Sequence, residues 1–212
     1  MKSGISTHLQ VAFFHFNSTK LYKLKLFIKN MVSRRCKMLV KFELNKLNVH
    51  FKSIGMGEIE INGTLTLLQK EKIKLALLES GLELIENKKA ILIEKIKNVV
   101  VELIHYTEEA PKQNFSDFLS EKLKYDYTYL ANIFSETEQT TIEQFIFRHK
   151  IERAKELIDY NELNMTEIAL KLHYSSVGHL SNQFKKITGN SPSYYKSQIN
   201  RDRNSLENVI IM

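Results

Sequence analysis

The sequence predicts an α+β domain followed by an all-α domain, and three observations predict this. In the first half, short stretches in which apolar and polar residues alternate are separated by two helix-like segments. In the second half, one apolar pattern occurs twice, 49 to 50 residues apart. Between the two copies runs a long segment without Gly or Pro, which is typical of one continuous helix.

The first domain is expected over residues 21–88, after a disordered extension at 1–20 that shows no regular period. In order, its elements are a strand over 21–30, a helix over 33–47, a strand pair over 49–54 and 57–65 around a Gly-Met-Gly turn, a helix over 67–81 and a strand over 82–87. This order, βαββαβ, is that of the ferredoxin-like fold.

The loop after the first strand resembles that of heavy-metal-associated domains, which carry M-x-C-x-x-C there. Here the loop reads "MVSRRC", from Met31 to Cys36, so Ser33 replaces the first thiol. Serine is a poor ligand for Cu(I), which favours thiolates. We therefore expect no metal site, with Ser33 acting as a helix cap and Cys36 as a half-exposed thiol. Metal binding by Cys36, or a reactive thiol beside Arg34 and Arg35, is the alternative.

The segment "SSVGHLSNQFKKITGNSPSYYK", residues 175–196, predicts a short helix with a polar outer face. Leu180, Phe184 and Ile187 recur at i, i+4, i+7 and are expected to form one buried stripe. Ser175 or Ser176 is the expected N-cap, and the helix should stop at Gly189 and Pro192. A second, polar stripe consists of Gly178, Ser181, Asn182 and Lys185.

A helix is also predicted just upstream, in "NMTEIALKLHY", where Asn164 and Glu167 suggest a capping box. Only a tight turn fits between Leu172 and Val177. Two short helices on such a turn form a helix-turn-helix, whose second helix fits the DNA major groove.

A second copy of this pattern lies in "FSDFLSEKLKYDYTYLANIFSE", residues 115–136. The first four matched pairs are 49 residues apart and the last two are 50 apart, which predicts one extra residue in the second turn. The pairs are Leu119 with Ile168, Ser120 with Ala169, Leu123 with Leu172, Tyr125 with Tyr174, Leu130 with Leu180 and Phe134 with Phe184.

The segment between the copies predicts one helix of about 20 residues, about 30 Å long at about 1.5 Å per residue. Its apolar positions are Phe147, Ile151, Ala154 and Ile158, with Leu157 alongside. Successive major grooves on one face of DNA are about 34 Å apart, so this helix could space two recognition helices by one turn of DNA.

Residues 90–198 resemble the DNA-binding domain of the AraC/XylS transcription regulators, through the linker-like "HKIERAKELI" and the closing "HLSNQFKKITGNSPSYYK". The resemblance implies seven helices over a domain at 89–199, promoter binding and, usually, activation of RNA polymerase. It leaves a homodimer open. It assigns base reading to Thr128, Ala131 and Asn132 in the first unit and Val177, Gly178 and Asn182 in the second, with Lys185 near phosphate. The predicted DNA-binding set also contains Tyr129, Ser176, Ser181 and Lys186.

The sequence departs from this family at several positions. Asn182 stands where arginine is usual, and Lys124 and His173 stand where the turns usually have glycine. Histidine can adopt the left-handed backbone that such a turn needs, at some cost. Because Val177 and Gly178 have no side-chain donors, base reading in the second groove should rest on Ser181 and Asn182, and asparagine suits adenine.

Charge is unevenly distributed along the chain, whose net charge is +7. Residues 1–89 have net charge +9, and residues 90–212 have net charge −2. Residues 171–203 carry six basic and one acidic side chain, whereas residues 115–138 carry two basic and five acidic ones. The second unit is therefore expected to supply most of the phosphate contacts.

Other function classes lack support in the sequence. Phosphate-loop, nucleophile-elbow and zinc-protease motifs are absent, so we expect neither an enzyme nor a bound cofactor. His149 is expected to be structural or solvated. The single cysteine, the short apolar run "VAFF" and the lack of a signal peptide favour a cytoplasmic protein that does not bind membranes, with a tail at 200–212.

The sequence thus predicts a transcription regulator that binds double-stranded DNA. The alternative is a metal or thiol carrier or sensor of the metallochaperone type, acting through the N-terminal domain while the C-terminal half makes protein contacts.

Overall fold

The computed structural model describes residues 24–107 and 113–197. The expected extension at 1–20 and the expected tail at 200–212 lie outside the described residues. Within these two ranges, no helix combines the length and the apolar character that crossing a bilayer requires.

The N-terminal part is a four-stranded antiparallel sheet with two helices, which confirms the predicted order of elements. Its strands lie in the order β2-β3-β1-β4, and each pairs with its neighbours in antiparallel fashion. The elements are β1 (Leu24–Lys29), α1 (Arg34–Lys46), β2 (Phe51–Ile54), β3 (Glu58–Ile61), α2 (Leu67–Glu79) and β4 (Glu83–Ile85).

Helices lie on both faces of this sheet. Alternate residues of β1, Leu26 and Ile28, are buried in one core with Val40 of α1 and Ile73 of α2. Phe27 lies between them in sequence and so points to the opposite face. There the Lys95 ammonium of helix α3 (Lys88–Val101) lies 4.9 Å from the centre of the Phe27 ring. Helices α1 and α2 thus cover one face, and α3 lies against the other.

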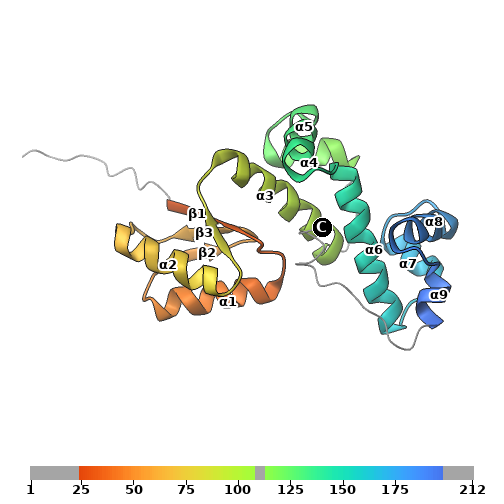
Figure 1. Cartoon of the computed structure of the whole chain (residues 1–212), viewed down its shortest axis with the longest axis horizontal. Helices are drawn as coiled ribbons and strands as arrows, with labels where there is room; N and C mark the ends of the chain where they lie inside the picture. Colours follow the sequence, from red (N-terminus) through yellow and green to blue (C-terminus); the bar gives the residue numbers. More distant parts are fainter. Residues whose placement is uncertain (1–23, 108–112, 198–212) are drawn as a thin grey trace, which may run out of the picture.

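The C-terminal part is helical throughout the residues described. After α3 come η1 (Glu102–Tyr106, a π-helix), α4 (Phe115–Leu123), α5 (Tyr127–Glu138), α6 (Ile142–Tyr160), α7 (Met165–Lys171), α8 (Val177–Thr188) and α9 (Pro192–Ser197). Figure 1 shows α6 as the central rod, with α4 and α5 at one end and α7, α8 and α9 at the other. The described part of 88–197 contains seven α-helices, from α3 to α9, in agreement with the expected number.

Helix α3 joins the two parts of the chain. Val32 and Met56 of the N-terminal part belong to the same buried cluster as Ile96 of α3 and Phe134 of α5. The Tyr106 hydroxyl of η1 donates a hydrogen bond to the Val32 carbonyl oxygen at 3.3 Å. The loop that resembles a metal-binding motif therefore packs against the helical part of the molecule.

The hairpin turn before β3 also touches α3. Gly57 has a left-handed backbone, with φ of 70°, and a side-chain carbon built on it would lie 2.1 Å from Nδ2 of Asn98. Only glycine fits this approach without moving Asn98.

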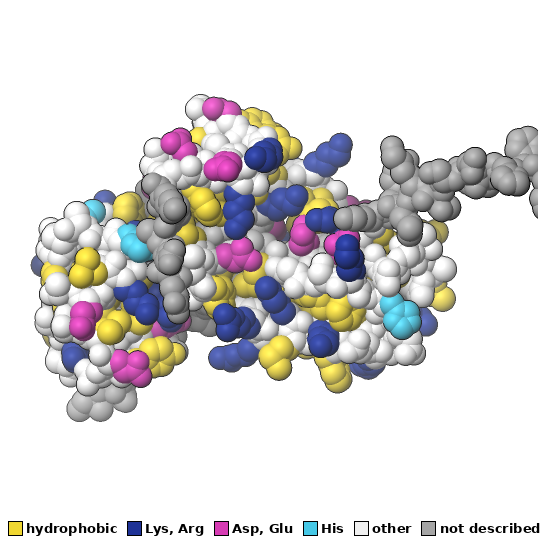
Figure 2. Space-filling model, turned by 180° about the vertical axis from the view of Figure 1, so that it is seen from behind, with side chains coloured by type: hydrophobic (Ala, Val, Ile, Leu, Met, Phe, Trp, Pro, Cys, Tyr) yellow, Lys and Arg dark blue, Asp and Glu magenta, His cyan; other side chains and the backbone are white. Residues whose placement is uncertain are grey.

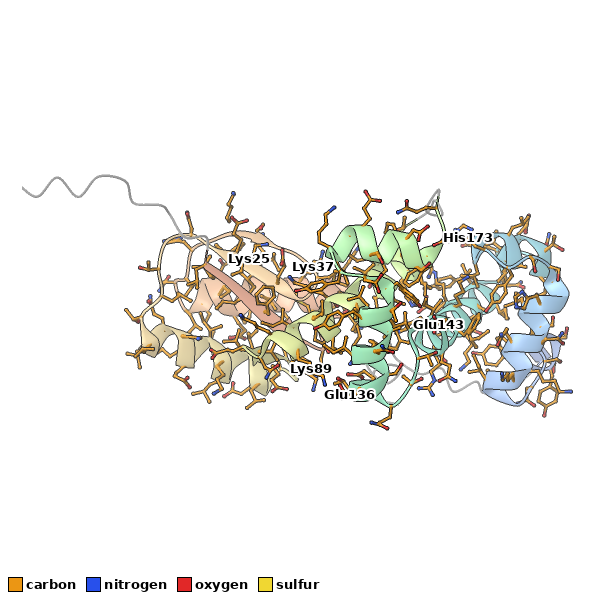
Figure 3. All side chains as sticks on the ribbon, turned by 90° about the horizontal axis from the view of Figure 1, so that it is seen from above. Lys25, Lys37, Lys89, Glu136, Glu143 and His173 are labelled. Carbon is orange, nitrogen blue, oxygen red and sulfur yellow. The ribbon has the colours of Figure 1, made fainter. Side chains whose placement is uncertain are left out.

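Ion pairs connect α3 to α5. The Lys97 ammonium is buried and lies 2.7 Å from a carboxylate oxygen of Glu138 and 3.3 Å from one of Glu94. Burial raises the pKa of Glu94, while Lys97 and the Asn30 amide oppose this shift. A second, exposed pair joins Lys89 and Glu136 at 2.6 Å, and these two side chains lie side by side in Figure 3.

Candidate nucleic-acid interface

The first helix-turn-helix unit consists of α4, a three-residue turn and α5. Asn114 caps α4 by accepting a hydrogen bond from the Asp117 amide, and Asp126 caps α5 by accepting from the Thr128 and Tyr129 amides. Lys124 is the C-cap of α4 and has a left-handed backbone, with φ of 63° and ψ of 37°. The turns of the family that the sequence resembles usually have glycine at this position. A residue with a side chain therefore makes this turn, at a conformational cost.

The second unit consists of α7, its C-cap Leu172, a four-residue turn and α8. Asn164 and Glu167 form the predicted capping box at the start of α7. Ser176, and not Ser175, is the N-cap of α8, where its hydroxyl accepts a hydrogen bond from the His179 amide at 3.1 Å. His173 has φ of 55°, so the predicted left-handed histidine is confirmed.

The two units bury equivalent residues, as the repeat predicted. Leu130 and Phe134 of α5 are fully buried, and so are their counterparts Leu180 and Phe184 of α8. The largest difference is between Tyr174, which is 7% exposed, and Tyr125, which is 48% exposed. Ser120 and Leu123 are also less buried than their counterparts Ala169 and Leu172. Ser175 separates Tyr174 from the N-cap Ser176, whereas Tyr125 directly precedes the N-cap Asp126.

The predicted burial of Ile187 is wrong. Its side chain is 39% exposed, although it shares a helix face with Leu180 and Phe184. Ile187 lies in the last turn of α8, where a hollow of about 370 Å³ opens beside Phe147 and Arg148 of α6. The apolar face of α8 is therefore exposed in its last turn.

Most of the predicted DNA-binding residues lie on the solvent side of the two recognition helices, opposite the buried leucine and phenylalanine. Ala131, Val177 and Ser181 are only partly exposed. Ala131 and Val177 pack against the cores of their units and so have a structural role as well. The exposed residues of the set are Thr128, Tyr129, Asn132, Ser176, Gly178, Asn182, Lys185 and Lys186.

In each unit, a turn tyrosine contacts an aromatic ring on the recognition helix. Tyr125 stacks on Tyr129 with ring centres 5.5 Å apart, and Tyr174 meets His179 edge-on at 5.2 Å. His179 is exposed on the first turn of α8 but is missing from the predicted set. The 50-residue offset between the copies pairs it with Tyr129 and could have identified it.

A hydrogen bond connects the first recognition helix to α6. The Tyr127 hydroxyl donates a hydrogen bond to the Glu143 carboxylate on the first turn of α6. Burial and the neighbouring Glu143 raise the pKa of Tyr127, so the phenol keeps its proton and remains a donor.

The electrostatic difference between the units is visible on the surface. Figure 2 shows Asp and Glu side chains at the top of the molecule, over the region of α4 and α5. Lys185 and Lys186 end the recognition helix of the second unit, whereas Ser135 and Glu136 occupy the matching positions of the first. The hydrogen bond from Lys89 lowers the pKa of Glu136, so this end of α5 stays anionic.

The cysteine loop has a structural role. Cys36 is 8% exposed, so the expectation of a half-exposed thiol is wrong. Ser33 caps α1 as predicted, accepting a hydrogen bond from the Cys36 amide at 3.3 Å, and its hydroxyl lies 3.2 Å from the Cys36 sulfur. Among the described residues, no three His, Cys, Asp or Glu side chains are grouped as a metal site would need.

Comparisons with known proteins agree with this geometry. Residues 119–198 match the family model of a helix-turn-helix domain. The chain is 24% identical over 103 residues to an uncharacterized HTH-type transcriptional regulator, YtdP, of Bacillus subtilis, covering 49% of this chain and 13% of that protein. It is 27% identical over 81 residues to the Msm operon regulatory protein of Streptococcus mutans, covering 38% of this chain and 29% of that protein.

Among solved structures, the C-terminal domain of the two-component response regulator yesN of Fusobacterium nucleatum is 29% identical, with a TM-score of 0.42. The match covers 49% of this chain and 96% of that structure. The chain thus spans less than a third of the length of the two curated relatives. The helix-turn-helix match and the two regulators support a helix-turn-helix domain of the kind that binds DNA in transcription regulators.

Proposed function

We propose that the chain is a sequence-specific transcription regulator that reads two successive major grooves with α5 and α8. The observation that carries this proposal is the repeated unit: two helix pairs bury the same leucine and phenylalanine and turn the opposite, polar side of the second helix to solvent. A polar, exposed face on a helix of this length is what base reading in the major groove requires.

Helix α6 supports the proposed spacing. It has 19 residues and no interruption, which corresponds to about 28 Å at about 1.5 Å per residue. Because both units pack against it, its length limits how far apart the two recognition helices can lie. This is close to the repeat of the major groove, about 34 Å.

The roles of individual residues follow from their chemistry. Asn132 and Asn182 are exposed at equivalent positions and would each pair with an adenine edge. Lys185 and Lys186 would neutralise phosphates. Arg148 of α6 lines the same hollow as Lys186. The second unit would then supply most of the electrostatic attraction.

We further propose that the N-terminal part, residues 21–88, is a ferredoxin-like domain. The strand order β2-β3-β1-β4, the antiparallel pairing and the helices that follow β1 and β3 support this assignment. Three further points stay predictions: the domain boundary at residue 88, contact with RNA polymerase, and a homodimer. A metal carrier function is not proposed, since Cys36 is buried and its loop packs on η1.

The proposal is tested by titrating the full chain with a duplex from the region upstream of its own gene and with a scrambled duplex, at several salt concentrations. Lys185→Ala should weaken binding to both duplexes alike and reduce the salt slope by about one unit. Asn132→Ala and Asn182→Ala should each cost about 1 to 3 kcal/mol on the specific duplex only and leave the salt slope unchanged.

Ser135→Ala is the matched control, because Ser135 is the counterpart of Lys185 in the first unit. It should leave the salt slope unchanged. Equal affinity of the unmodified chain for both duplexes would refute sequence-specific reading. A salt slope that responds to Ser135→Ala but not to Lys185→Ala would refute the role given to the second unit.

A further inference from the structure

A cavity of about 510 Å³ opens where the N-terminal part, η1, α6 and the second helix-turn-helix unit meet. Arg34 at the start of α1 lines it on one side, and Lys171 and His173 of the second unit line it on another. Residues 103–106 of η1, Thr107, Gln113 and Phe115, together with one face of α6, complete the described lining. This volume lies in the range of pockets that bind small organic molecules.

Part of the lining is apolar. Leu103 and Ile104 of η1, Phe115 of α4, Ile146 of α6 and Leu172 of the second unit all border the cavity. An occupant with an apolar body would therefore bury hydrocarbon or aromatic surface here.

The remaining lining is strongly cationic. Arg34, Lys150, Arg153 and Lys171 all border the cavity. Of these, only Arg153 has a carboxylate partner among the described residues, Glu156 at 2.6 Å. Arg34 lies 5.4 Å from the centre of the Tyr106 ring and Lys150 lies 5.0 Å from that of Tyr174, so aromatic faces offset their charges only in part.

The histidines at the cavity take up protons less readily than ordinary histidines. Burial and the nearby Arg153 lower the pKa of His105 to about 3. Burial and Lys150 lower the pKa of His173 as well. Burial also lowers the pKa of Lys150. A negative group in the cavity would offset the cost of holding these cations together.

We propose that this cavity binds a small organic anion, with its apolar body against η1 and α6 and its negative group facing Lys150, Arg34 and Lys171. The anion would touch the N-terminal part through Arg34 and the second unit through Lys171 and the turn residue His173, which Figure 3 shows at the edge of that unit. Binding would fix the second recognition helix relative to the rest of the molecule. This consequence, unlike the binding itself, rests on the proposed function.

The experiment uses 2-naphthoate as the anionic probe and 2-naphthamide as a neutral probe of the same shape, in equilibrium dialysis against the full chain without DNA. We expect one 2-naphthoate per chain and at least tenfold weaker binding of 2-naphthamide. Lys150→Met and Lys171→Met should each weaken 2-naphthoate binding several-fold and leave 2-naphthamide unaffected. Ile146→Trp, which fills the cavity, should abolish binding of both probes.

Lys41→Met removes an exposed cation of α1 that does not line the cavity, and it should change neither affinity. Absence of 2-naphthoate binding, equal binding of the two probes, or binding that ignores both lysine substitutions would overturn the proposal. Because the lysine variants alter only the lining, the test holds even if Ile146→Trp fails to fold.

A separate measurement tests the consequence for DNA. Addition of 2-naphthoate should change the affinity of the chain for its specific duplex several-fold, and Lys150→Met should remove this change. Since dialysis contains no DNA, failure of the DNA-binding proposal leaves the binding result intact. Tight 2-naphthoate binding with no effect on DNA affinity would refute only the coupling.

Discussion

Nε2 of His105 in η1 and Nδ1 of His149 in α6 lie 3.2 Å apart. His149 is fully buried, and its Nε2 has no partner among the described residues. Burial lowers the pKa of both rings to about 3, from an ordinary value of 6.5. Both are therefore neutral in the folded chain at mildly acidic pH.

This pair makes stability depend on pH. In the unfolded chain both histidines take up protons below about pH 6.5, whereas in the folded chain they do so only near pH 3. The pair therefore contributes its full share of the unfolding free energy above about pH 6.5, and this share falls as the pH drops. His149→Leu should make the slope of unfolding free energy against pH shallower by about one proton, or about 1.4 kcal/mol per pH unit between pH 6 and 4.

Phe145→Leu is the matched control, since the Phe145 ring packs 4.5 Å from that of His149 and does not titrate. It should lower the unfolding free energy at every pH and leave the slope unchanged. Urea unfolding at a series of pH values gives both quantities. An unchanged slope in His149→Leu would contradict the assignment.

The buried ion pairs of Lys97 should matter for stability far more than the exposed pair between the same helices. Lys97→Met leaves Glu94 buried without its cation and should cost about 3 to 5 kcal/mol of unfolding free energy at pH 7. Lys89→Met, which removes the exposed partner of Glu136, should have a much smaller effect.

The double substitution Lys97→Met with Glu94→Gln should recover much of the loss, because it removes the charge left behind. Denaturant unfolding measures all three variants. Equal losses from Lys97→Met and Lys89→Met would contradict a buried charge network between α3 and α5.

Lys124 holds a left-handed backbone that disfavours residues with a side chain. Lys124→Gly should therefore stabilise the chain by about 0.5 to 1 kcal/mol, after the larger chain entropy of glycine is allowed for. Lys124→Ala keeps the strain and should give no such gain. The midpoint of thermal unfolding for the two variants distinguishes relief of strain from loss of the lysine charge.

The affinity of the chain for metal ions should not depend on Cys36. Cys36 is buried, and Ser33 occupies the position of the missing thiol while capping α1. We expect Cys36→Ala and the unmodified chain to bind Cu(I) or Zn(II) equally weakly in competition with a chelator of known affinity. Stoichiometric metal that disappears with Cys36→Ala would instead support a metal sensor or carrier.

Much of this fold could be predicted from the sequence because its signals are local. Alternation and helical periodicity identified every described strand and the helices of both units. Caps such as Ser33, Asn164 and Ser176 lie next to the elements they begin. The repeat was recognisable because Leu130 and Phe134 and their counterparts occupy equivalent core positions.

The features that sequence reasoning missed depend on contacts between distant segments. Ile187 is exposed at a hollow that Phe147 and Arg148 of α6 also line, and Cys36 is buried in the core of the N-terminal part. The His105 and His149 pair joins residues 44 positions apart, for which no local pattern exists. The cationic cavity likewise collects Arg34, Lys150 and Lys171 from three separate elements.

Hydroxyl-radical footprinting of the full chain on the region upstream of its gene tests the central claim most directly. Two recognition helices in successive major grooves should protect two patches on one face of the DNA, about one helical turn apart, within about 20 base pairs. Asn132→Ala should weaken one patch and Asn182→Ala the other. A single protected patch, or two patches on opposite faces of the duplex, would contradict reading by both helices.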